Sequence, residues 1–263
     1  MDEEKVRFGG MALANGVLVH GPSSWACAVR LPNGELRIAS DYKRFRAADV
    51  DRPLLRGPAR LLEAFSLLPE LKRKLPEARL PFQRPAVMAA MGASAAAVRL
   101  VRASDRLGAG ARELVSGLLA LIPAAVALRG SELSAYHGAE HVTIGSYEHG
   151  EQRGKEHERC GSHLVGPLLV TTAIGNILAA RAPIHLRGAA RALAGFGALA
   201  ASTEIFGWMI RHPDAPVSRA LAKPGHELQH RLATSAPTSE QLEVAEAALR
   251  ECLRLEHGAE DSN

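Results

Sequence analysis

Four stretches of the chain contain almost no charged residues, and they restrict its fold more than any other feature of the sequence. They cover residues 85–98, 114–128, 160–180 and 192–210, and only Glu204 interrupts the last of them. A helix needs about 20 apolar residues to cross the hydrocarbon core of a bilayer. The third and fourth stretches are therefore long enough to span a membrane. The first two are marginal and also fit tilted spans, re-entrant segments or buried helices.

The apolar residues are mostly Ala, Leu and Val, because only 4% of the 263 residues are aromatic. Small aliphatic side chains suit close helix packing better than a β-sandwich core. We therefore expect a mainly α protein: a membrane helical bundle with a small N-terminal region that contains a β-hairpin, and a soluble C-terminal helix. The balance of 32 basic against 28 acidic residues is too even for a dedicated nucleic-acid binder. The expected partner is the lipid bilayer, not nucleic acid.

We divide the sequence into three segments. Residues 1–84 form an N-terminal α+β region, in which alternating apolar residues on both sides of Asn33 and Gly34 predict a hairpin. Residues 85–212 form the membrane-associated helical region. Residues 213–263 form a helical tail that contains an amphipathic helix after Pro237.

Basic residues predict the orientation in the membrane. Lys and Arg are frequent in the first 84 residues and again after Ile210, which places both termini in the cytoplasm by the positive-inside rule. An even number of spans, two or four, then puts the loop from Arg129 to Arg159 on the same side of the inner membrane. No apolar segment precedes residue 9, so we expect insertion to depend on internal segments, not on a cleaved signal.

This loop contains the string YHGAEHVTIGSYEHG at residues 136–150. On a helix that begins near Ser131, the side chains of His137, Glu140 and His141 share one face. Two imidazoles four residues apart chelate a divalent ion, for which we expect zinc, and Glu140 then accepts a proton from metal-bound water. Inverzincin peptidases use the same order of residues. The alternative is a polar helix whose histidines are only solvated.

A catalytic site of this kind needs a third protein ligand and an open position. Glu204 is the preferred candidate, because an unpaired carboxylate in an apolar segment costs several kcal/mol. It would otherwise pair with Arg211 or with nearby hydroxyl groups. Glu148 is the second candidate. Cys160 and His163 suit a soft ligand pair or a thiol nucleophile with its base, although a buried thiol is the more common arrangement.

Several segments resemble the YqhQ-like membrane proteins of bacteria and plastids, which carry a domain of unknown function described as a predicted metal-dependent enzyme. They are GGMALANGVLVHGP, RGPARLLEA, YHGAEHVTIGSYEHG with RCGSH, STEIFGWMIRH and PGHELQHRLAT with SEQLEVAEAAL. The resemblance implies a protein with several membrane spans and a cytoplasmic motif. The positions that match the family pattern are His137, Glu140, His141, Glu148, Cys160 and Glu204.

The chain departs from that pattern at Val142, where a lysine is expected, and at Asn15, where a glutamate is expected. The segment between Gly150 and Arg159 is also shorter. These differences leave the two histidines and Glu140 in place.

The leading functional hypothesis is a metal-dependent hydrolase in which His137 and His141 bind zinc and Glu140 is the general base. Its substrate is open, because a peptide, a lipid and a phosphoester are all compatible with this chemistry. The alternative is a non-catalytic membrane scaffold, or an adaptor that holds a cytoplasmic protein partner. A closed shell of four ligands favours the scaffold, whereas three ligands and a cleft favour the enzyme.

Overall fold

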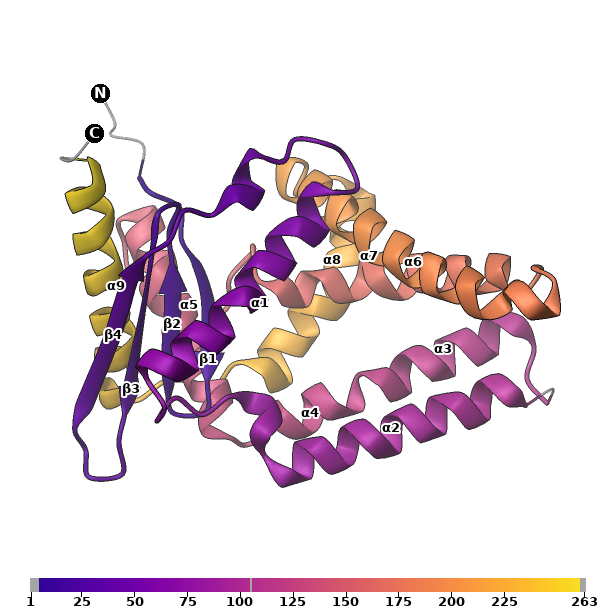
Figure 1. Ribbon diagram of the computed structural model, residues 1–263, viewed down its shortest axis with the longest axis horizontal. Coiled ribbons are helices and arrows are strands. Elements are labelled where there is room, and N and C mark those ends of the chain that lie inside the picture. The colour runs from indigo at the N-terminus through magenta and orange to yellow at the C-terminus, as the bar shows by residue number, and fades with distance from the viewer. Residues whose placement is uncertain (1–4, 105, 261–263) are drawn as a thin grey trace.

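The computed structural model describes residues 5–104 and 106–260, and it shows a layered body from which two helical hairpins project (Figure 1). The fold is mainly helical with a small N-terminal antiparallel sheet, as predicted. The strands are β1 (Gly9–Leu13), β2 (Gly16–His20), β3 (Ser24–Arg30) and β4 (Leu36–Tyr42). The α-helices are α1 (Arg56–Lys74), α2 (Pro85–Ala103), α3 (Ala109–Ala120), α4 (Ile122–Leu128), α5 (Glu132–His149), α6 (Val165–Ala179), α7 (Arg187–Arg211), α8 (Pro216–Leu228) and α9 (Ser239–Glu260).

The four strands form a meander in the order β1-β2-β3-β4. The predicted hairpin joins β3 to β4, with Ser24 opposite Tyr42 and Arg30 opposite Leu36. Gly34 adopts a φ of 85° in its turn, a backbone conformation that glycine reaches without steric cost. Two further strands, β1 and β2, precede this hairpin in the chain and complete the sheet.

Both faces of the sheet are covered, because its apolar residues alternate along β2 and β3. Val17 and Val19 pack with α5 and α9, including Ala139. Leu18 and Trp25 point the other way and pack against α1. The result is a three-layer body with α5 and α9 on one side of the sheet and α1 on the other (Figure 1).

Helix α9 is docked on the sheet and on α5 over most of its length. At its start, the Gln241 side chain accepts from the Thr238 backbone N–H and the Thr238 hydroxyl accepts from the Gln241 N–H, at 2.9 and 3.3 Å. This is the reciprocal capping arrangement expected from the sequence. Near its end, the buried Glu256 carboxylate accepts hydrogen bonds from Ser23, just before β3, and from Ser24, the first residue of β3. The body thus combines all three sequence segments.

The two projecting hairpins contain four helical stretches long and apolar enough to cross a membrane: residues 85–103, 109–128, 161–179 and 184–211. The structure therefore extends the two marginal stretches to 19 and 20 residues. Only 11% to 22% of each stretch is buried within the protein. Apolar surfaces of this extent are incompatible with water, so the hairpins are suited to association with lipid.

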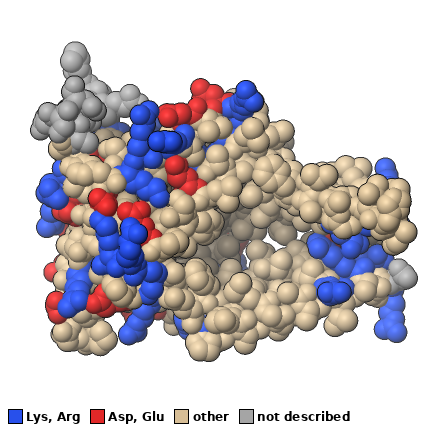
Figure 2. Space-filling view, in the orientation of Figure 1, with Lys and Arg blue, Asp and Glu red and all other residues tan. Residues whose placement is uncertain are grey.

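Charge is distributed unevenly between the body and the hairpins (Figure 2). The body displays intermixed basic and acidic side chains, whereas the hairpins are nearly uncharged except for basic residues toward their far end. There, Glu113 accepts hydrogen bonds from Asn176 at 2.8 Å and from Arg102 at 3.3 Å. This polar contact connects α2, α3 and α6, and the pairing lowers the cost of keeping a carboxylate among apolar helices.

Leu71→Ala should destabilise the body, because Leu71 is fully buried between α1 and the sheet. We expect the free energy of unfolding to fall by about 2–5 kcal/mol, the usual cost of such a cavity. Leu62→Ala is the matched control, since Leu62 lies on the same helix and is 70% exposed. Denaturant titration of the detergent-solubilised variants compares the two, and equal midpoints would contradict the placement of α1.

Candidate metal centre

Helix α5 carries the HxxEH residues at the centre of the body. It begins after Ser131, as predicted, and ends at Gly150, whose φ of 72° terminates the helix. Gly138 and Gly10 allow other segments to lie directly on it. A Cβ atom on Gly138 would overlap the Ser235 carbonyl, and one on Gly10 would overlap the Glu140 carboxylate. The centre therefore lies between α5, β1 and the segment around residue 235.

Three potential ligands converge at this point: His137, His141 and Cys160. One ligand atom from each lies within 4.8 Å of the others. The Cys160 Sγ lies 3.6 Å from the His137 Nε2. Zinc bonds of about 2.3 Å to sulfur and about 2.0 Å to nitrogen, at a tetrahedral angle, place these two atoms about 3.5 Å apart. The Cys160–His137 pair thus matches the spacing of two ligands of one zinc ion, and His141 offers a third ligand atom within 4.8 Å of both.

Hydrogen bonds at the far side of each ring define the state of the two imidazoles. His137 Nδ1 lies 3.0 Å from the Ala233 carbonyl oxygen, and His141 Nδ1 lies 2.8 Å from the Lys155 carbonyl oxygen. A carbonyl oxygen only accepts, so in both rings Nδ1 carries the hydrogen and donates it. Nε2 is the atom that each ring then offers to a ligand, which is the usual arrangement of metal-binding histidines.

Two neighbouring histidines are occupied differently. His157 Nε2 lies 3.2 Å from Glu148 Oε2, and its Nδ1 accepts from the Arg159 backbone at 3.3 Å. His163 donates from Nδ1 to the Ala222 carbonyl, and its Nε2 lies 3.0 Å from the Gln229 amide nitrogen. Both nitrogens of each ring are therefore engaged. The described part of the chain leaves neither ring available as a fourth ligand in this conformation.

Glu140 is buried and lies against the same cavity as the three ligands. Burial raises the pKa of its carboxyl group, while the nearby His137 and the Ala12 backbone amide oppose this effect. The cavity has a volume of about 220 Å³, far more than one water molecule requires. A carboxyl group with a raised pKa beside such a cavity is suited to proton transfer.

The structure places both predicted carboxylate ligands elsewhere. Glu204 accepts hydrogen bonds from Arg56 and from the Leu54 backbone, and it is absent from the described ligand group. The guanidinium group of Arg56, on α1, compensates the charge of the Glu204 carboxylate. The sequence alone instead suggests a metal ion or Arg211 as its partner. The sequence spacing could not reveal this, because Arg56 lies 148 residues away.

Glu148 likewise forms hydrogen bonds with neighbouring side chains and is not part of the described group of potential metal ligands. Its carboxylate accepts from His157 and, at 2.6 Å, from Arg159. Burial by itself raises the pKa of Glu148, but the His157 hydrogen bond and the Arg159 charge outweigh it and hold that pKa below its usual value. In this arrangement Glu148 orients the segment that leads to Cys160.

Gln229, which the sequence analysis does not single out, connects the segments around the centre. It is completely buried, accepts from the His157 backbone N–H at 2.9 Å and donates to the Ser162 hydroxyl at 2.8 Å. It lies at the start of the π-helical turn Gln229–Ala233, whose last residue binds His137. In the sequence, Gln229 is only one polar residue in the segment PGHELQH. Nothing there indicates that its side chain is buried or which residues it binds.

We expect His137→Ala and Cys160→Ala to lose bound zinc, because each substitution removes one of three ligands. Glu204→Gln should retain it, since that carboxylate binds Arg56. His149→Ala is the matched control, because His149 is exposed on the same helix and its Nδ1 binds the Gly145 carbonyl. Elemental analysis of the purified variants measures the effect. Equal zinc content in His137→Ala and His149→Ala would contradict the site.

Comparison with known proteins finds similarity over the C-terminal half of the chain. Residues 127–255 match the family model "Protein of unknown function (DUF1385)". The chain is 33% identical over 129 residues to the uncharacterized protein YqhQ of Bacillus subtilis (strain 168), a match that covers 46% of this chain and 40% of that relative. No solved structure matches. Residues 127–255 are therefore similar to the YqhQ-like DUF1385 family, whose function is unknown.

Proposed function

We propose that the protein is a metal-dependent hydrolase whose centre lies at the cytoplasmic face of the inner membrane. One observation carries the proposal: His137 and His141 each present a free Nε2 toward Cys160, next to the buried Glu140. Three protein ligands beside a cavity are typical of a catalytic zinc site, whereas structural sites use four.

Each residue has a distinct role in this proposal. His137, His141 and Cys160 hold the ion, and the Ala233 and Lys155 carbonyls orient the two rings. A zinc ion in such a site supplies Lewis acidity and lowers the pKa of water toward about 7. Glu140 accepts a proton from the attacking water and passes it to the leaving group. Water is thus added across the broken bond, and no other reactant is consumed.

The competing function is a structural metal site in a membrane scaffold. It requires a fourth protein ligand, and both ring nitrogens are engaged in His157, which lines the cavity of the metal centre, and in His163. The cavity at the three ligands leaves room for a substrate group instead. The geometry therefore favours catalysis over a purely structural role.

The four apolar helices support membrane attachment, and the excess of basic residues in the N-terminal segment, residues 1–84, favours its location in the cytoplasm. In this proposal the metal centre lies on the cytoplasmic side, because it belongs to the same body as β1 and α9, the first and last described elements (Figure 1). The short connections at the far ends of the hairpins then face the opposite side.

Glu140→Gln should keep its zinc but lose hydrolytic activity by about 10²–10⁴-fold, the usual contribution of a general base. Glu246→Gln on the exposed side of α9 is the control and should retain full activity. Turnover of 4-nitrophenyl acetate, bis(4-nitrophenyl) phosphate and a quenched fluorescent peptide provides the measurement. Zinc-loaded wild-type protein inactive on all three, or an active Glu140→Gln variant, would favour the scaffold.

The orientation is tested by introducing single cysteines in a Cys160→Ser background, where the remaining Cys27 and Cys252 are buried. Arg106→Cys, in the connection between α2 and α3, should react with a membrane-impermeant maleimide in intact spheroplasts. Arg44→Cys, in the body, should react only after permeabilisation. The opposite labelling pattern would place the metal centre outside the cytoplasm.

A further inference from the structure

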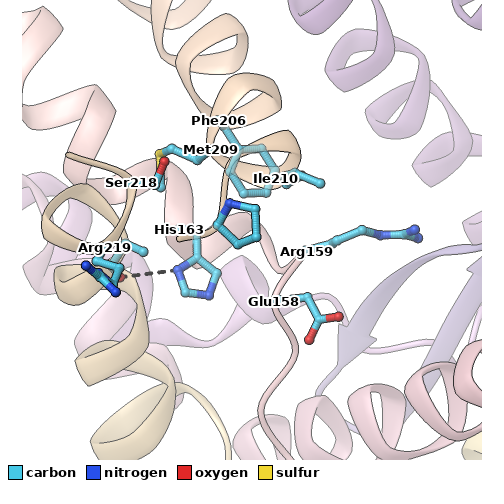
Figure 3. A pocket seen from close by; sticks show the side chains of 10 residues that line it. Glu158, Arg159, His163, Phe206, Met209, Ile210, Ser218 and Arg219 are labelled. Carbon is cyan, nitrogen blue, oxygen red and sulfur yellow. Dashed lines mark hydrogen bonds between the residues drawn. The ribbon is translucent and has the colours of Figure 1, made fainter. Parts of the chain in front are cut away.

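A second cavity, of about 410 Å³, lies where the α6–α7 hairpin joins the body. Its apolar wall consists of Phe206, Met209 and Ile210, at the end of the last candidate span. Figure 3 shows these side chains near one another, with His163 between Arg159 and Arg219 across the cavity. The cavity therefore combines a wall that belongs to a membrane-spanning helix with basic side chains from the body.

Two polar groups in this cavity are without partners. The Ser218 hydroxyl is buried, with 2% of the residue exposed, and finds no hydrogen-bond partner among the described residues. Arg219 is exposed, and the described chain gives it no acidic partner. A buried unsatisfied hydroxyl carries a cost of about 1–3 kcal/mol. An unpaired guanidinium and an unused donor indicate that a ligand with acceptor oxygens completes this site.

This cavity is adjacent to the metal centre. Arg159 lines both cavities. A third cavity shares His163 and Arg219 with the apolar one and His157 with the metal centre. It extends along α8 past Lys223 and His226. This third cavity is polar and lined by side chains of both signs, including Glu156 and Glu158, and it shares residues with both the membrane-level cavity and the metal centre.

We infer that the apolar cavity binds an anionic phospholipid, which is the substrate class of the hydrolase; this step rests on the proposed function. The acyl chain lies against Phe206, Met209 and Ile210, and Arg219 and Ser218 bind the phosphate. The position of the wall at the end of a candidate span is the level at which a bilayer presents its head groups. A lipid enters here without leaving the membrane, and its head group points toward Arg159 and the metal centre.

The experiment uses full-length protein in phosphatidylcholine vesicles that contain a trace of phosphatidylglycerol with a diazirine on its acyl chain. After illumination, we expect labelled peptides to include residues 206–210 and α8. Unlabelled phosphatidylglycerol should compete with this labelling, whereas inorganic phosphate and additional phosphatidylcholine should not. Arg219→Glu should reduce it about tenfold, the scale of one charge-assisted hydrogen bond. Arg250→Glu, the same exchange on an exposed position of α9, should leave it unchanged.

Labelling spread evenly over all four apolar helices, or insensitive to Arg219→Glu, would overturn lipid recognition by this cavity. Equal competition by phosphatidylcholine would overturn the role of the anionic head group. Ser218→Ala provides a second test that avoids a change of charge, with a smaller loss of labelling expected. The variant His137→Ala separates the two proposals. We expect it to lose zinc and to keep the photolabelling, because His137 does not line the apolar cavity. Failure of hydrolysis therefore does not imply failure of lipid binding.

Discussion

Two backbone carbonyls, from Lys155 and Ala233, are the constraint on which the candidate centre depends. They hold the Nδ1 hydrogens of His141 and His137, at 2.8 and 3.0 Å, and thereby direct both Nε2 atoms toward Cys160. Neither carbonyl belongs to the helix that carries the histidines. Lys155 also donates from its side chain to the Thr234 carbonyl at 3.0 Å, so the two segments that supply these carbonyls are joined to each other. The ligand geometry is thus a property of three chain segments together.

The layered body explains how those segments are held. The sheet packs on α5 and α9 through one face and on α1 through the other, which gives α5 a rigid support. Gly10 lets β1 approach the Glu140 carboxylate and closes that side of the centre to solvent. Preorganisation of this kind is needed for a site whose ligands must converge within tenths of an ångström.

The hairpins have a different physical basis. Their helices pack on each other through small residues and remain apolar on their outer surfaces, which is compatible with association with a membrane. The ion pair between Glu204 and Arg56 lies where α7 meets α1 and connects a candidate span to the body. The cavity of about 410 Å³ lies near the same end of α7. The candidate spans and the cavities that lead toward the metal centre therefore meet at one place in the fold.

The sequence by itself determined the local features: charge-free helical stretches, the hairpin at Gly34, the capped helix α9, and one helical face shared by His137, Glu140 and His141. These follow from residue periodicity and short-range hydrogen bonds. Only the tertiary structure decided that Cys160, not Glu204 or Glu148, joins the two histidines. The physical reason is that a carboxylate pairs with whichever cation the fold brings near, and for Glu204 and Glu148 these are Arg56 and Arg159. No spacing along the chain encodes such contacts between distant segments.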